Sequence, residues 1–155
     1  MPRKFLVVAD DSEEFSAALR YAARRARSTG GMVTLLKVLP PSTNDYFSGV
    51  REEIEAQQRQ EGEALLARLG AEAEERSGAK AEYLIEFGDS LPAIRRVVAA
   101  DPAIKILVLA SAVGGRGPGP LVSAVAKDGV GAGGRKLPVT VVPGDLSDQD
   151  IEDLA

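Results

Sequence analysis

The stretch IKILVLASAVGGRGPGPLVSAVA, residues 104–126, decides the fold expected of this chain. It opens with β-branched and aliphatic residues from Ile104 to Leu109, passes through four glycines, and returns to apolar residues at helical spacing. This order predicts a buried strand, a glycine loop and a helix. In a parallel sheet such a loop faces the binding crevice, where the helix amino terminus offers unpaired N–H groups to an anion. We therefore interpret the loop as a phosphate cradle, with a tight connection that binds no ligand as the alternative.

The composition limits the kinds of chemistry open to the chain. Its 155 residues suffice for one domain with a sizeable core, and the 45% hydrophobic and 27% charged fractions are typical of a soluble globular protein. There is no cysteine and no histidine, which excludes disulfides, thiolate and Ser-His chemistry, and zinc sites that need nitrogen or sulfur ligands. Any catalysis would rest on Asp, Glu, Lys, Ser or a bound metal.

Charge and hydropathy exclude two kinds of partner. A formal net charge of -4 offers no field for nucleic acid or for an anionic membrane surface. No apolar window reaches the roughly 18 residues that a membrane span needs, and the amino terminus enters a strand without the apolar core of a signal peptide. We therefore expect a cytoplasmic protein that binds neither nucleic acid nor membrane.

Strand-like and helix-like segments alternate along the chain. Five short apolar runs predict strands buried on both faces, and this β-α alternation favours an α/β fold, a single-domain doubly wound parallel sheet. The domain is expected over residues 1–155, with its core at 4–144 and an acidic tail at 145–155 that docks as a last helical turn or frays. The expected strands are Lys4–Ala9, Met32–Leu39, Ala79–Phe87, Ile104–Ala110 and Leu137–Val142, and the expected helices begin at or just after Ser12, Val50, Ser90 and Pro120.

Three connecting segments have features of their own. Val50–Arg76 is rich in charge with an intermittent apolar stripe, which predicts a long surface helix loosened near its glycines. Ser42–Gly49 is a polar turn region whose aromatics, Tyr46 and Phe47, cover the core edge or fold back over a pocket. Asp128–Arg135 is dense in glycine, which indicates a mobile connection rather than a second anion site.

Two strand ends carry the residues most suited to binding. Asp10-Asp11-Ser12 follows the first strand, and Ser111 with the glycine loop follows the fourth. If these strands are neighbours at the topological switch point, both ends meet in one crevice, with N–H donors for phosphates and a carboxylate for a ribose or base edge. The acidic residues could instead cap the helix that begins there. The two roles are compatible if Asp11 or Ser12 caps the helix while Asp10 faces the crevice.

With this pattern the chain resembles the universal stress protein family over almost its whole length. The resemblance implies a five-stranded parallel sheet in the order 3-2-1-4-5, the adenine nucleotide alpha hydrolase-like fold, and a homodimer. It also implies ATP or a related adenine nucleotide as ligand, with Mg²⁺, and no dedicated catalytic machine. The segments that carry the resemblance are the first strand with Asp10 and Ser12, the loop Ser111–Ser123 and the ending Pro138–Pro143.

The resemblance also assigns site residues, at the ends of the first, second and fourth strands. The matching positions are Ala9 and Asp10 beside the adenosine, Val38 beside the base, Ala110 and Ser111 at the start of the fourth-strand loop, and Gly119 beside the phosphates. The full set of predicted nucleotide-binding residues is Ala9, Asp10, Ser12, Val38, Ala110, Ser111, Gly114, Gly115, Gly117, Gly119 and Ser123.

The glycine loop departs from the family's ATP-binding branch, which has glycine, two residues, glycine, nine residues, glycine and then Ser or Thr. Here Gly119 and Gly129 have the nine-residue gap, but position 116 is Arg rather than Gly and position 130 is Val. Residues 114–119 could cradle phosphates in another way, with Arg116 as a cationic clamp. The broken spacing favours the alternative of a dimeric interaction platform of the same fold, with a protein partner and no nucleotide.

The favoured function is an adenine-nucleotide-binding stress-response sensor or switch, non-catalytic or at most a slow ATPase. A receiver-type phosphorylation switch would need a lysine after the fifth strand, where Pro143-Gly144 stands. An adenylating enzyme would need a serine-glycine-glycine loop after the first strand, which residues 9–12 do not supply. The sequence offers no convincing general base.

Overall fold

Five parallel strands form one sheet in the order β3-β2-β1-β4-β5 in the computed structural model, which describes residues 2–10, 12–41, 48–113, 117–131 and 135–155. This confirms the α/β fold and the strand order expected from the sequence. The chain crosses from one side of β1 to the other, so the carboxyl ends of β1 and β4 flank the topological switch point. The elements are β1 (Lys4–Val8), α1 (Glu13–Thr29), β2 (Met32–Leu39), α2 (Ser48–Ser77), β3 (Glu82–Phe87), α3 (Ser90–Ala100), β4 (Ile104–Ser111), α4 (Pro120–Asp128), β5 (Val139–Pro143) and α5 (Asp148–Leu154).

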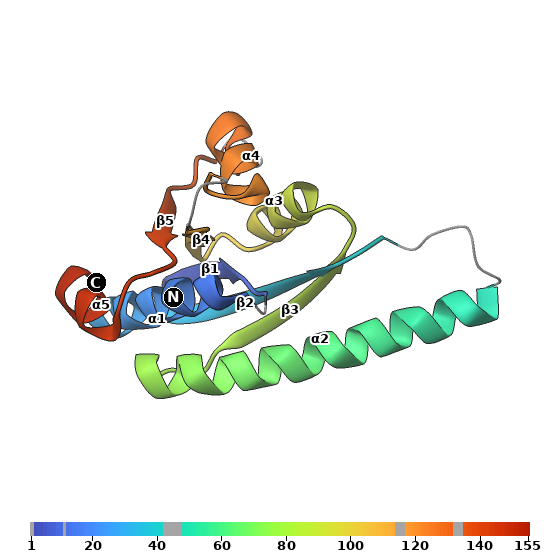
Figure 1. The fold of residues 1–155 in the computed structure, drawn as a ribbon, viewed down its shortest axis with the longest axis horizontal. Helices are drawn as coiled ribbons and strands as arrows, with labels where there is room; N and C mark the ends of the chain where they lie inside the picture. Colours follow the sequence, from blue (N-terminus) through green and yellow to red (C-terminus); the bar gives the residue numbers. More distant parts are fainter. Residues whose placement is uncertain (1, 11, 42–47, 114–116, 132–134) are drawn as a thin grey trace.

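Helices cover both faces of the sheet (Figure 1). One buried cluster joins the sheet to α1 and α2, and a second joins it to α3 and α4. Successive residues of a strand point to opposite faces, so strands covered on both sides need apolar residues throughout. Strand residues of the first cluster include Phe5, Val7, Leu35 and Val108, and those of the second include Leu6, Leu36, Ile104 and Leu107.

Helix α1 begins and ends at residues suited to helix termini. The Ser12 hydroxyl accepts a hydrogen bond from the Phe15 N–H at 3.3 Å, which satisfies one of the first unpaired donors of the helix. At the other end Gly30 adopts a φ of 69°, a left-handed conformation that favours glycine. Ala18 and Ala22 are fully buried, so this helix lies close against the sheet.

Helix α2 runs unbroken for 30 residues, so the expected loosening near Gly62 or Gly70 is wrong. Both glycines are buried and face the sheet. A Cβ atom at Gly70 would lie 2.2 Å from Cε1 of Tyr83 on β3, which shows that glycine here permits a close approach of helix and strand. The amino-terminal part of α2 extends beyond the carboxyl ends of β2 and β3 (Figure 1).

Two expected strand starts are wrong by two or three residues. The third strand begins at Glu82 rather than Ala79, because the Ser77 hydroxyl and the Ala79 backbone form a hydrogen-bonded turn at 3.2 Å. The fifth begins at Val139, immediately after Pro138, which has no N–H to donate to a ladder.

The glycine-dense segment after α4 is anchored at its end by Arg135. Its guanidinium donates to backbone carbonyls at the end of α3 and the start of β4, and Val130 within the segment is buried. The expected mobile connection therefore has a fixed end at Arg135. The acceptors of the Arg135 hydrogen bonds are the carbonyl oxygens of Val98, Asp101 (3.2 Å), Pro102 (3.2 Å) and Ile104 (2.6 Å). Residues 132–134 of this segment lie outside the described residues. Tyr46 and Phe47 of the earlier polar turn region also lie outside them.

The acidic tail docks rather than frays. Its helix α5 starts with a reciprocal pair of hydrogen bonds between Ser147 and Asp150, both at 3.1 Å. Ile151 is only 4% exposed, whereas Leu154, the other apolar side chain of this helix, is 64% exposed. Docking therefore depends on a single well-buried apolar side chain together with polar contacts.

A polar cluster joins the amino ends of β1, β2 and β3 to the α3–β4 connection. The Lys4 ammonium lies 2.6 Å from Asp101 Oδ2 and 3.0 Å from Glu82 Oε2, and the buried Thr34 hydroxyl donates to Glu82 Oε1 at 3.2 Å. The hydrogen bond to Asp101 is the main cause that raises the pKa of Lys4, and the same bond lowers the pKa of Asp101. The cluster stabilises the fold as long as both groups are charged.

We expect Asp101→Asn to lower the free energy of unfolding by about 1–3 kcal/mol near neutral pH, because it removes the charge that pairs with Lys4. A lowered folded-state pKa stabilises the protein above the unfolded value of 3.8, and this contribution is lost as pH falls through the folded pKa. The raised pKa of Lys4 acts in the opposite direction, contributing below 10.5 and fading as pH rises through its folded value. Urea unfolding of both proteins over a pH series measures the difference. A difference that stayed constant well below pH 3.8 would contradict this explanation.

Candidate functional site

A crevice of about 290 Å³ opens at the carboxyl ends of β1 and β4. It lies at the switch point, where the sequence predicted that the two strand ends would meet. Its walls come from the end of β1 and the start of α1, from the end of β4, and from the start of α4. Apolar side chains dominate these walls, including Val8, Phe15, Leu109, Leu121 and Val122.

The loop after β1 contributes a carboxylate to this crevice. Asp10 is exposed, and its Oδ1 accepts the Ser12 N–H at 2.7 Å, which fixes the side chain over the turn. Its Oδ2 has no hydrogen-bond partner among the described residues. Ser12 caps α1 and Asp10 faces the crevice. This is the combination in which the two roles expected of this loop are compatible. Asp11 lies outside the described residues.

The start of α4 contributes backbone donors. Gly119 precedes the helix with a φ of 110°, which favours glycine, and Pro120 occupies the first turn. The N–H groups of Leu121 and Val122 belong to this first turn and have no carbonyl partner within the helix. All four residues line the crevice, so the positive end of a helix dipole points toward it. This is the arrangement that binds anions at helix amino termini.

The carboxyl end of β5 packs against Glu14, one of the residues in the wall of the site. The Gly144 N–H donates to the Ser111 carbonyl at 3.1 Å, and a Cβ at Gly144 would lie 2.6 Å from the Cβ and Cγ of Glu14. Glycine is therefore needed where β5 passes α1. Glu14 itself lines the crevice, so the site has a second acidic residue besides Asp10. The described lining residues include no lysine or arginine.

The structure brings together some of the residues predicted from the sequence. Asp10, Ser12, Ala110 and Gly119 line the crevice. Ala9 is buried directly behind it, where its N–H donates to the Leu36 carbonyl at 2.7 Å.

Other predicted residues lie elsewhere. Val38 packs in the α3–α4 side of the core with Val8 and Leu121 but does not line the crevice. Ser111, Gly117 and Ser123 are not among its lining residues either. The glycines Gly114 and Gly115, and Arg116 between them and Gly117, lie outside the described residues.

Several other residues line the crevice that were not predicted from the sequence, among them Glu14, Phe15 and Leu109. A usable signal existed for two of them. Glu14 and Phe15 fall in the first turn of a helix that starts at the predicted binding loop, so their side chains stay near its end. Leu109 belongs to an apolar strand with no mark to separate a crevice residue from a core residue.

The chain matches the model of the universal stress protein family over residues 1–143. It belongs to this family. Among curated protein sequences, none matches the chain. Among the helices of the described residues, none is long and apolar enough to cross a membrane.

Solved structures of family members share the fold. The Lactobacillus plantarum universal stress protein UspA has a TM-score of 0.73 at 19% identity, covering 90% of this chain and 97% of that one. An Arabidopsis thaliana family protein with AMP bound has a TM-score of 0.61 at 22% identity, covering 92% of each chain. The Archaeoglobus fulgidus universal stress protein in complex with dAMP has a TM-score of 0.53 at 23% identity, covering 90% of this chain and 97% of that one. These likenesses establish the sheet architecture of the chain.

Proposed function

We propose that this universal stress protein binds an adenine nucleotide in the crevice between β1, β4 and α4, and that it acts as a nucleotide-dependent sensor or switch in the stress response. The observation that carries the proposal is the meeting of Asp10 with the amino terminus of α4 at the switch point of the sheet. The AMP and dAMP complexes of the family members from Arabidopsis and Archaeoglobus support the choice of ligand.

Each part of the crevice suits one part of a nucleotide. The apolar side chains of Val8, Leu109 and Val122 suit an adenine ring. Asp10, with Oδ2 available, can accept hydrogen bonds from ribose hydroxyls. The first turn of α4 offers N–H groups to a phosphate.

The test of binding is a thermal-shift titration with AMP, ADP and ATP. A ligand that binds only the folded state at 100 times its Kd stabilises it by about 2.7 kcal/mol, which corresponds to a rise in Tm of roughly 5–10 °C for a chain of this size. GMP at the same concentrations is the control for base recognition. The absence of a shift with every adenine nucleotide at millimolar concentration would leave the interaction platform as the function.

We expect the crevice to bind AMP more tightly than free ATP, and Mg²⁺ to reduce this difference. Asp10 and Glu14 place two carboxylates beside the site, and they repel the extra charge of a triphosphate. The described residues contain no group of three or more acidic side chains that could hold a metal by themselves, so Mg²⁺ would arrive on the phosphates. Calorimetric titration with and without Mg²⁺ measures the effect. Free ATP binding as tightly as AMP would show that the carboxylates do not oppose the phosphates.

We also propose that the protein forms a homodimer through the free edge of β5. Among the strands of the described residues this strand pairs only with β4, and an unpaired edge must be covered or blunted. Val141 is 42% exposed there. We expect Val141→Lys to convert a dimer to a monomer, as measured by light scattering after size-exclusion chromatography.

The matched control for this dimer is Val50→Lys. Val50 lies on α2, away from β5, and is 43% exposed, almost the same as Val141. The Val50→Lys variant should leave the molecular mass measured by light scattering unchanged. If both variants dissociate the dimer, or neither does, β5 is not the interface.

A further inference from the structure

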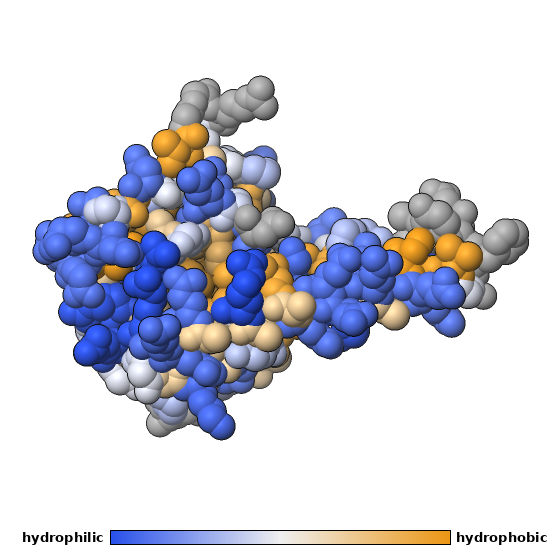
Figure 2. Space-filling view, turned by 60° about the horizontal axis from the view of Figure 1, so that its bottom comes forward, coloured by the Kyte–Doolittle hydropathy of each residue, from blue (hydrophilic) through white to orange (hydrophobic). Residues whose placement is uncertain are grey.

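A charged groove of about 640 Å³ lies between α1, the carboxyl-terminal part of α2, and α5. Four arginines line it, three from α1 and one from α2, together with Glu72 and Glu75 of α2, and α5 forms one of its walls. Within this lining Glu72 pairs with two of the arginines, at 3.0 Å and 3.3 Å. Figure 2 shows a mostly hydrophilic surface at this end of the molecule, the left end of the view. The four are Arg20, Arg24, Arg27 and Arg76.

The acidic face of α5 pairs with these arginines. Arg20 Nη1 donates to Asp148 Oδ1 at 3.1 Å, and Arg24 Nε donates to Glu152 Oε2 at 3.2 Å. Asp148 and Glu152 are four residues apart and lie on one helix face with Ile151, the buried side chain of this helix. Arg27, also in the groove, has no ion pair among the described residues. The groove therefore recognises a helix by two acids and one apolar residue between them.

The tail changes the charge of the whole chain. Its last 11 residues carry five of the 23 acidic side chains and none of the 19 basic ones, so residues 1–144 alone have 19 basic and 18 acidic side chains. The family match ends at residue 143, and α5 lies beyond it. An acidic helix outside the family segment thus covers a surface within it that carries four arginines and two glutamates.

This helix is held weakly. Asp148 and Glu152 are 62% and 61% exposed, and ion pairs at such exposure contribute little to stability. Helix α5 has only seven residues, so it has almost no helical stability of its own. An acidic helix with better contacts can therefore displace it.

We propose that this groove is a docking surface for an acidic amphipathic helix of a partner protein, and that α5 occupies it until the partner takes its place. The site lies on the flank of α1 and α2 and does not depend on nucleotide binding in the crevice. The partner helix presents an acid, an apolar residue and a second acid with the spacing of Asp148, Ile151 and Glu152.

The experiment measures binding of a fluorescent peptide of residues 145–155 to the full-length chain by anisotropy. Ile151→Asn removes the apolar anchor of the internal helix without adding charge. We expect this variant to bind the peptide at least about tenfold more tightly than the wild type, because occupancy by α5 reduces the apparent affinity by the fraction of open groove. The double variant Asp148→Asn, Glu152→Gln changes only exposed side chains. It replaces Ile151→Asn in the binding experiment if that variant does not fold. Hydrogen exchange of both variants should show loss of protection in α5.

Two matched controls test the specificity of the groove. In the Ile151→Asn chain, Arg76→Glu should abolish peptide binding, whereas Arg68→Glu should not. Both residues lie on α2, but Arg68 does not line the groove. A scrambled peptide of the same composition should not bind.

Three results would overturn the proposal. The first is equal affinity for the peptide in the wild type and in the variants that weaken the docking of α5. The second is equal binding of the scrambled peptide, or equal losses from Arg76→Glu and Arg68→Glu, which would show a nonspecific charge effect. The third is exchange of α5 between wild-type copies in a concentration-dependent dimer, because the occupant would then be a second copy of the chain.

Discussion

Replacing Asp10 by alanine is expected to weaken AMP binding by about 10- to 150-fold, the range that follows from losing hydrogen bonds to a charged group worth about 1.5–3 kcal/mol. The carboxylate faces the crevice, and its Oδ2 has no hydrogen-bond partner among the described residues. Asp10→Asn should have a smaller effect, because an amide oxygen can still accept the Ser12 N–H and one ribose hydroxyl. Calorimetric titration of AMP into each variant gives the affinities.

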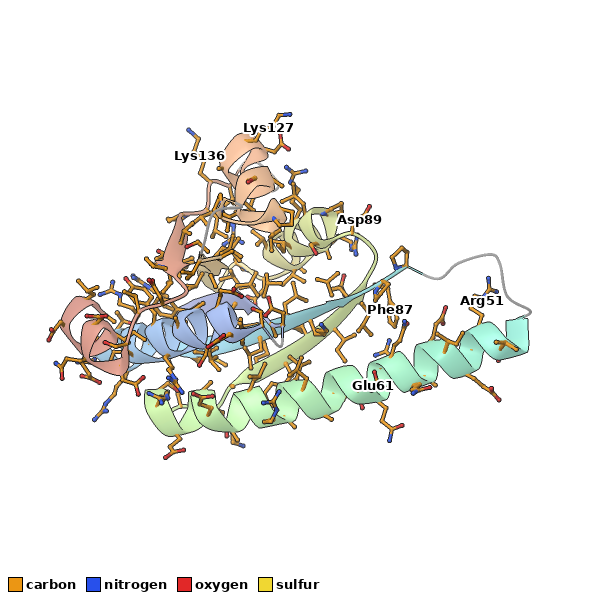
Figure 3. The ribbon with its side chains drawn as sticks, viewed as in Figure 1. Arg51, Glu61, Phe87, Asp89, Lys127 and Lys136 are labelled. Carbon is orange, nitrogen blue, oxygen red and sulfur yellow. The ribbon has the colours of Figure 1, made fainter. Side chains whose placement is uncertain are left out.

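Asp89→Ala is the matched control for Asp10→Ala. Asp89 is also an exposed aspartate between a strand and a helix, and its side chain makes no capping hydrogen bond. Figure 3 shows it at the start of α3, and it is not among the residues that line the crevice. AMP affinity should be unchanged in this variant. Equal affinity in the wild type and in Asp10→Ala would remove Asp10 from the site.

Truncating Leu109 is expected to lower both stability and nucleotide affinity. The side chain is 4% exposed and belongs to the core between β4 and the α3–α4 layer, so Leu109→Ala should cost about 2–5 kcal/mol of unfolding free energy. The same side chain lines the crevice, so AMP affinity should fall about tenfold as apolar contact with the base is lost. Urea unfolding measures the loss of stability. Calorimetric titration with AMP, at a temperature below the unfolding transition of the variant, measures the loss of affinity.

Leu107→Ala separates these two effects. Leu107 lies two residues earlier on the same strand and in the same buried cluster, but it does not line the crevice. We expect a similar loss of stability, about 2–5 kcal/mol, with AMP affinity close to that of the wild type. If both variants lost affinity equally, the effect would come from general destabilisation, and Leu109 would have no direct contact with the ligand.

The fold was predictable because the parallel sheet leaves a strong pattern in the sequence. Strands covered on both faces must be apolar throughout, and the run from Ile104 to Leu109 shows this directly. The glycines of α2 were harder to interpret. Sequence alone treats Gly70 as a weak point of a helix, whereas its reason lies in the Tyr83 ring on β3, which packs against the helix in the folded chain. The docking of α5 depends likewise on ion pairs more than a hundred residues apart in the chain, such as Arg24 with Glu152.

The candidate site was predictable at Asp10, Ser12 and Gly119, but not at Glu14 or at its apolar walls. Asp10, Ser12 and Gly119 interrupt apolar patterns at strand and helix ends, where local sequence shows them. Leu109 has no such mark, because a crevice wall and a core are made of the same side chains. Ser111 and Ser123 were expected in the site from the matched loop, yet neither side chain is among the lining residues of the crevice.

The most direct test of nucleotide binding at the switch point is an AMP titration followed by the amide resonances of the ¹⁵N-labelled chain. Binding in the crevice predicts saturable shifts of the Asp10, Ser12, Leu121 and Val122 amides, with those on the outer face of α2 unchanged. Saturable shifts confined to another surface, or no shifts at millimolar AMP, would contradict it.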